Sequence, residues 1–179
     1  MKTVKSLLFC LICTVFTVSC NLQNHYLSKE ERLVNNLLAK TANIVKIKYN
    51  LTPSGSSASM PGGPIRKLSL CFNTQYPHTQ DQLRELLLKS ADELVIQVNR
   101  SNEIQEYLNE PPFTIKNVQI IIYNHDEEGQ MLYDPQILTA ELSNNILTYR
   151  TAQSDGTLKL KQQFTETYEE ALKRISKAC

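Results

Sequence analysis

The stretch TQDQLRELLLKSADELVIQVN, residues 79–99, indicates the fold class most clearly. Thr79 and Gln82 have the spacing of a capping box, in which two side chains satisfy the free amides at a helix start. Apolar residues then recur every three or four positions, at Leu83, Leu86, Leu87, Ala91, Leu94, Val95 and Val98. This period places them on one face of a helix, which we expect to pack on a sheet.

Five segments between turn-forming residues are predicted as β-strands: 67–73, 115–123, 137–142, 146–151 and 157–162. In the first segment, Leu68, Leu70 and Phe72 alternate with polar residues, so one of its faces is apolar. Short polar residues and glycine, which suit tight turns, separate the later strands. We therefore expect these later strands to form an antiparallel meander.

Helices are predicted before and after this strand-rich region. Ser28 and Glu31 form a second capping-box pattern, and the helix that they open runs to about Lys48, although its last turn also fits a strand. Thr167 and Glu170 have the same spacing before an amphipathic segment that reaches the C-terminus. A capped helix therefore closes the chain.

The order of the elements predicts the fold class. A short helix over 102–108, ended by Pro111-Pro112, precedes the cluster of strands. Strands that cluster apart from helices are typical of α+β domains. We therefore expect one α+β domain over 28–179, with an antiparallel sheet of about five strands and helices packed mainly on one face.

Residues 50–64 show no helical or strand period. They contain three of the five glycines, three of the seven prolines and four serines. Such a composition predicts a long loop without regular structure. A flexible surface loop and a binding surface are both compatible with it.

The N-terminus has the pattern of an export signal. Lys2 and Lys5 precede an apolar run over 7–18, and the small residue Ser19 lies just before Cys20. This run of twelve residues is too short to span a bilayer, which takes about 20 apolar residues. We therefore expect residues 1–19 to be a signal peptide that is removed.

Thr17-Val18-Ser19-Cys20 resembles the lipobox of bacterial lipoproteins, with Thr17 where leucine is usual. The resemblance implies cleavage before Cys20 and lipid attached to that cysteine, so that a membrane is the first partner. Asn21 in place of Asp implies sorting to the outer membrane, by the same resemblance. Residues 20–27 would then be the lipidated cysteine and a short tether. The alternative is an ordinary secretory signal cut nearby.

Three short stretches in the body of the chain loosely resemble uncharacterised small lipoproteins of Chlamydia-like bacteria. They are Met60-Pro61-Gly62-Gly63, Pro112-Phe113-Thr114 and Glu166-Thr167-Tyr168-Glu169-Glu170. This resemblance implies no activity.

The charge balance argues against a nucleic-acid partner. The formal net charge of the whole chain is +1, and removal of Lys2 and Lys5 with the signal leaves −1. Domains that bind nucleic acids usually carry a basic patch or stripe. We therefore expect no nucleic acid among the partners.

Three cysteines remain after cleavage: Cys20, Cys71 and Cys179. If Cys20 carries lipid, a Cys71–Cys179 disulfide could form in an oxidising compartment and close a loop of about 110 residues. Strand alternation, however, places Cys71 opposite the apolar face, whereas Cys179 continues the apolar stripe of the last helix. A disulfide and two separate thiols therefore both remain possible.

No motif for catalysis, a cofactor or a metal is present in the sequence. His25, His78 and His125 are isolated, whereas zinc sites need ligands at paired spacings. Residues 124–129 begin like a calcium loop, but Pro135 stands where the final glutamate is needed, which favours a hairpin turn. We therefore expect no cofactor and no enzymatic activity.

The sequence predicts a lipid-anchored protein of the cell envelope with an interaction or structural role and an envelope protein as its partner. One alternative is a carrier of a small ligand or lipid, which needs an apolar cavity of about 300 Å³ or more. The other is an envelope hydrolase, which needs a cleft with convergent titratable groups. An interaction protein needs neither feature.

Overall fold

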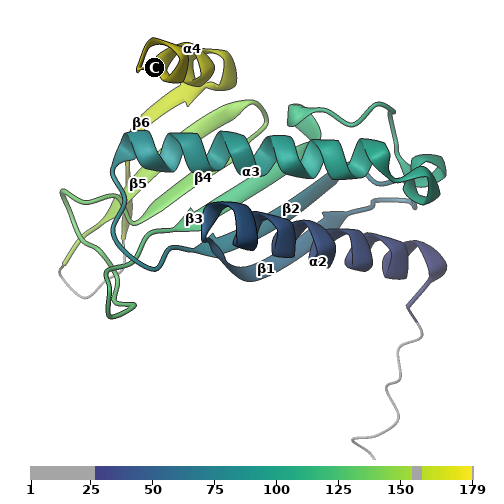
Figure 1. Cartoon of the computed structure of the whole chain (residues 1–179), viewed down its shortest axis with the longest axis horizontal. Coiled ribbons are helices and arrows are strands. Elements are labelled where there is room, and N and C mark those ends of the chain that lie inside the picture. The colour runs from purple at the N-terminus through teal and green to yellow at the C-terminus, as the bar shows by residue number, and fades with distance from the viewer. Residues whose placement is uncertain (1–26, 155–158, 179) are drawn as a thin grey trace, which may run out of the picture.

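The computed structural model describes residues 27–154 and 159–178, which form a layer of helices on a six-stranded sheet (Figure 1). The elements are α2 (Lys29–Tyr49), β1 (Thr52–Ser59), β2 (Lys67–Asn73), α3 (Gln80–Arg100), the 3-10 helices η2 (Asn102–Tyr107) and η3 (Ile115–Asn117), β3 (Val118–Tyr123), β4 (Thr139–Ser143), β5 (Ile146–Ala152), β6 (Leu160–Thr167) and α4 (Tyr168–Ala178). The predicted α+β class is confirmed, with six strands in place of about five.

The strands lie in the sheet in the order of the sequence, from β1 to β6. Neighbouring strands are antiparallel except β2 and β3, which run parallel with Leu68 opposite Val118. Parallel neighbours require a crossover connection, and α3 provides it. The predicted meander is confirmed for β3 to β6, and the sheet departs from the predicted antiparallel arrangement at this one pair.

Helices α2 and α3 lie side by side over one face of the sheet, and α4 packs beside β6 against α3 (Figure 1). The predicted apolar stripe of α3 lies at the centre of the core. Leu87 and Leu94 are fully buried in the same cluster as Ile120 and Ile122 of β3. The stripe therefore packs on the sheet as its spacing predicts.

The predicted helix starts are confirmed. The three predicted capping boxes join Ser28 with Glu31, Thr79 with Gln82 and Thr167 with Glu170. Helix α2 continues to Tyr49 and ends at Asn50, whose φ of 55° is left-handed. The strand alternative for its last turn is therefore wrong.

Strand β1 corrects the prediction of no regular element over 50–64. It pairs antiparallel with β2 along its whole length, with a bulge between Pro53 and Gly55. Small polar residues have little β propensity, but pairing with a neighbouring strand overrides this weak preference. The turn is confined to the residues after β1, where Gly62 and Gly63 have φ of 76° and 110°.

Other boundaries move by a few residues. The predicted strand over 115–123 starts with the 3-10 turn η3, and the predicted helix over 102–108 is the 3-10 helix η2. The strand predicted over 157–162 is β6, displaced toward the C-terminus. The ends of strands are poorly specified by the local sequence, because they depend on where the neighbouring strands pair.

Candidate functional site

Strand β1 leaves one edge of the sheet open. It is the first strand in the sheet and pairs only with β2 among the described residues, so its outer backbone N–H and C=O groups face no other strand. An unpaired edge of this kind is a template for a further strand. With eight residues, β1 is longer than a typical strand of about five to six.

This edge has few of the features that normally prevent strand pairing. The sequence of β1, TPSGSSAS, has no charged residue, and Pro53 with the adjacent bulge protects only its start. Charged side chains, prolines and bulges usually protect edge strands. The opposite edge, β6, carries Lys161 and Glu166 and pairs with β5 through a bulge. The part of β1 over 55–59 is therefore the less protected edge.

A groove runs between α2 and β1. Ser56 and Ala58 lie opposite Leu70 and Leu68 of β2, and residues opposite each other point to the same face of a sheet. Ser56 and Ala58 therefore face the helical layer, yet both are exposed. Helix α2 packs beside β1, but these small side chains do not fill the space between the two elements.

Two hollows lie along this groove. The first, of about 380 Å³, is lined by Ala39, Ala42 and Lys46 of α2 with Gly55 and Ser56 of β1. The second, of about 400 Å³, is lined by Leu27, Glu31, Val34, Asn35, Ala58 and Met60. Both volumes are within the roughly 300 to 1,000 Å³ of small-ligand pockets. The groove therefore offers space for side chains beside an open backbone edge.

Apolar side chains dominate the first hollow, whereas the second hollow also has the polar side chains of Glu31 and Asn35 in its lining. Val34, Leu38 and Ala42 of α2 are buried and line its helical side. Lys46 lies beside the start of β1, and Glu31 lies toward its end. The groove is therefore positively charged near the start of β1 and negatively charged near its end.

An ion pair with α3 fixes the helical wall of the groove. The Nζ atom of Lys48 lies 2.6 Å from Oε2 of Glu93, and Gln97 donates a hydrogen bond of 2.8 Å to Oε1. Burial acts to raise the pKa of Glu93, but these hydrogen bonds outweigh it and lower the pKa below its ordinary value. Helix α2 is thereby held in place from the side away from β1.

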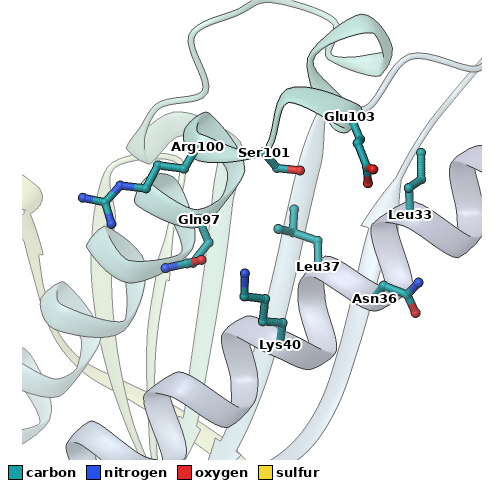
Figure 2. Close-up of a pocket in the computed structure, with 8 residues that line it drawn as sticks. All are labelled: Leu33, Asn36, Leu37, Lys40, Gln97, Arg100, Ser101 and Glu103. Carbon is teal, nitrogen blue, oxygen red and sulfur yellow. The ribbon is translucent and has the colours of Figure 1, made fainter.

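A third hollow, of about 250 Å³, lies between α2 and the end of α3 (Figure 2). Figure 2 shows Lys40 and Gln97 reaching into the gap between the helices, while the guanidinium of Arg100 points away. This volume is below that of usual small-ligand pockets. Its charged groups do not converge, so it is a weaker candidate than the groove.

A hollow of about 470 Å³ lies beyond the carboxyl ends of β2 and β3, and its lining includes His78, Asp134 and Thr151. Buried Asn124 shapes it by accepting a hydrogen bond from the backbone of His78 (2.9 Å) and donating to the carbonyl of Ile137 (2.8 Å). His78 and Asp134 are the titratable groups that a hydrolase would use. In the described structure, no hydrogen bond or ion pair joins them.

A buried ion cluster joins α3, β6 and α4. Arg84 Nε donates to Oε1 of Glu166 at 2.6 Å, and the hydroxyl of Tyr149 donates to the same oxygen at 2.8 Å. Burial and this bond to Glu166 raise the pKa of Tyr149, so the phenol remains protonated. The second oxygen of Glu166 forms an ion pair with Arg174 of α4 at 3.1 Å and accepts no hydrogen bond. Because the charged groups pair with one another, we interpret the cluster as a structural contact.

The face of the sheet away from the helices carries a chain of polar contacts. Ser69 donates to Gln119 at 3.0 Å, Gln119 donates to Glu141 at 2.7 Å, and Arg150 donates to Glu141 at 2.8 Å. Cys71 is on this face, and burial with nearby Glu141 raises the pKa of its thiol. These polar side chains form hydrogen bonds with one another, whereas the outer backbone groups of β1 pair with no described strand. The edge of β1 is therefore the stronger candidate for binding.

The predicted lipidation site Cys20 lies outside the described residues, as does Cys179. Cys71 is a free thiol in the described structure, so its disulfide with Cys179 stays a prediction. Asp126 accepts backbone hydrogen bonds from Glu128 (3.0 Å) and Gln130 (2.7 Å), as expected of a hairpin turn. None of the described helices is both long and apolar enough to cross a membrane.

Searches of protein-family models, curated proteins and solved structures found no match to this chain. The candidate site therefore rests on geometry. Sequence reasoning missed it because residues 52–59 show no apolar alternation. The available signal was the turn-forming run over 60–64 between two segments of similar length, which is typical of a hairpin.

Proposed function

We propose that this protein is a lipid-anchored envelope protein that binds a partner protein by pairing a segment of that partner with the edge of β1. Lipid on Cys20 would hold it at the outer membrane. The sequence over 17–20 supports the anchor. The observation that carries the binding role is the uncharged edge of β1 over 55–59 beside two hollows.

The position of the groove suits a partner close to the same membrane. Leu27, the first described residue, lines the second hollow, so one end of the groove lies where the tether joins the domain. The seven residues over 21–27 span at most roughly 25 Å when extended. A lipid on Cys20 would therefore keep the groove near the headgroups.

The two alternatives have weaker support. A carrier would bind its ligand between the sheet and the helices, but Leu70, Phe72 and Leu87 are fully buried in that layer. A hydrolase would use the hollow that contains His78 and Asp134, which no interaction in the described structure brings together. Strand pairing at β1 requires no such convergence.

A photo-crosslinking residue at Ser56 in living cells tests the proposal. We expect an adduct with one extended segment of an envelope protein. The same residue at Lys161, on the other edge of the sheet, is the matched control and should give no such adduct. Ser57→Lys adds an edge charge and should abolish the Ser56 adduct. Equal adducts from both edges, or insensitivity to Ser57→Lys, would contradict the proposal.

A further inference from the structure

We infer that the groove accepts an extended segment antiparallel to β1, with apolar side chains four residues apart, a basic residue near its start and an acidic residue near its end. This inference rests on the proposed function. It follows from the backbone of β1, the sizes of the two hollows and the charges near the groove ends.

The open edge of β1 requires an extended occupant. A further strand would lie about 4.8 Å away and pair with the unpaired N–H and C=O groups. A helix satisfies its own backbone groups and cannot pair with an edge. Antiparallel pairs are slightly more stable per residue than parallel ones, so the favoured direction is opposite to that of β1.

Strand β1 of a second copy would fit the edge but not the hollows. It would present Ser56 and Ala58 toward the helical side, and such small side chains would leave most of the 380 Å³ and 400 Å³ hollows unfilled. The apolar side chains that line the hollows would then stay in contact with water, which is unfavourable. The hollows therefore favour a different chain with larger apolar side chains.

The positions of the hollows set the spacing of those side chains. Along β1, the first hollow extends from Pro53 to Ser56 and the second extends from Ala58 to Met60, so their centres lie about four residues apart. Side chains on one face of a strand are an even number of residues apart, with a rise of about 3.4 Å per residue. A separation of about four residues therefore places the apolar side chains at i and i+4.

Lys46 and Glu31 set the order of the charges. An antiparallel occupant begins beside Glu31 and ends beside Lys46, because β1 starts at the Lys46 end. Lys46 forms no ion pair within the described residues, whereas Lys48 is engaged with Glu93. A basic start and an acidic end therefore complement the groove.

Two synthetic peptides test the inference. The matching peptide has about ten residues, with isoleucine at i and i+4, threonine elsewhere, arginine first and glutamate last. Its twin exchanges the arginine and the glutamate. We expect the mature full-length chain to bind the matching peptide about 3- to 30-fold more tightly than the twin, as two exposed ion pairs allow. Fluorescence anisotropy measures both affinities.

Three variants separate the parts of the inference. Lys46→Glu should remove or reverse the preference for the matching peptide. Lys40→Glu is the matched control, because Lys40 lies on the same helix but lines the hollow of Figure 2, and it should keep the preference. Ala39→Trp fills the first hollow from an exposed position and should weaken binding of the matching peptide at least about tenfold.

The outcomes distinguish this inference from the proposed function. Equal binding of the two peptides, no binding of either, or a preference that survives Lys46→Glu overturns the inference, while a Ser56 adduct in cells would still support the proposed function. Absence of both peptide binding and the adduct overturns both. A Ser56–Ser56 crosslinked dimer would show that a second copy of the chain binds the edge. A crosslink from Ser56 to residues 21–26 would show that the chain's own tether binds it. Either result overturns the inference.

Discussion

The Nε atom of Arg84 lies 2.6 Å from a carboxylate oxygen of Glu166, and both side chains are almost fully buried, at 4% and 1% exposure. The pair joins α3 to β6 across 82 residues of sequence. Arg174 of α4 lies 3.1 Å from the second oxygen of Glu166. One buried carboxylate therefore links α3, β6 and α4.

Glu166→Gln should destabilise the domain by about 3 to 5 kcal/mol, because removing one partner of a buried pair leaves the other charge uncompensated. Urea unfolding measures the free energy. Glu85→Gln is the control, since its ion pair with Lys89 is half exposed and should contribute less than about 1 kcal/mol. Equal stabilities of the two variants would show that the buried pair does not hold α4 and β6 to α3.

Acid should weaken the contact between α2 and α3. Burial acts to raise the pKa of Glu93, but hydrogen bonds from Lys48 and Gln97 lower it below the ordinary value of 4.5. A carboxylate with a depressed folded-state pKa contributes stability above its unfolded-state pKa and loses it as the pH falls through the folded-state pKa. The wild-type chain should therefore lose this contribution below about pH 4.5.

Urea unfolding at several pH values from about pH 7 down to about pH 3 measures that loss. The Glu93→Gln variant has no carboxylate at this position to be protonated. Its free energy of unfolding should therefore fall less over the acidic interval than that of the wild type. The same slope for both proteins below about pH 4.5 would mean that Glu93 is not linked to folding.

Leu87→Ala tests the core beneath α3. Leu87 is fully buried, and truncation should reduce the free energy of unfolding by roughly 2 to 5 kcal/mol and lower the Tm. Ile96→Ala, on the same helix but 41% exposed, should change it by less than about 1 kcal/mol. Thermal unfolding compares the two variants, and a Tm near that of the wild type for Leu87→Ala would place the core elsewhere.

Cys20→Ser tests the predicted anchor. Each buried CH₂ of an acyl chain contributes about 0.8 kcal/mol of membrane binding, so a chain without lipid should move from the membrane to the soluble fraction. Cell fractionation with immunoblotting measures this partition. Cys71→Ser should remain with the membrane, because Cys71 belongs to the folded domain. Membrane retention of Cys20→Ser would rule out anchoring through that residue.

Local spacing was enough to predict the helices and the meander. The apolar period around Leu87 and Leu94 and the capping pair of Thr79 and Gln82 depend on residues within one helix, and the structure confirms them. Strand β1 could not be predicted this way, because its small polar residues adopt strand structure only where β2 pairs with them. The candidate groove was missed with it.

Contacts between residues far apart in the chain also could not be predicted from the sequence. Arg84 lies next to Leu83 within the apolar stripe, so a charged residue on a buried face signals a buried partner. Nothing in the sequence identifies that partner as Glu166, because folding alone brings the two residues together. The parallel pairing of β2 with β3 also could not be predicted, because it joins segments about fifty residues apart.

That parallel pairing makes the sheet that supports the groove depend on residues far along the chain. Leu68 of β2 pairs with Val118 of β3, fifty residues further along the chain, and such long-range pairings form slowly because a long loop must close first. Helix α2 and β1 precede β3 in the chain, but β2, which supports β1, gains its inner neighbour only when β3 is added. A chain that ends before Val118 would carry the groove residues without the sheet that shapes them, so partner binding at β1 would select chains that have completed folding.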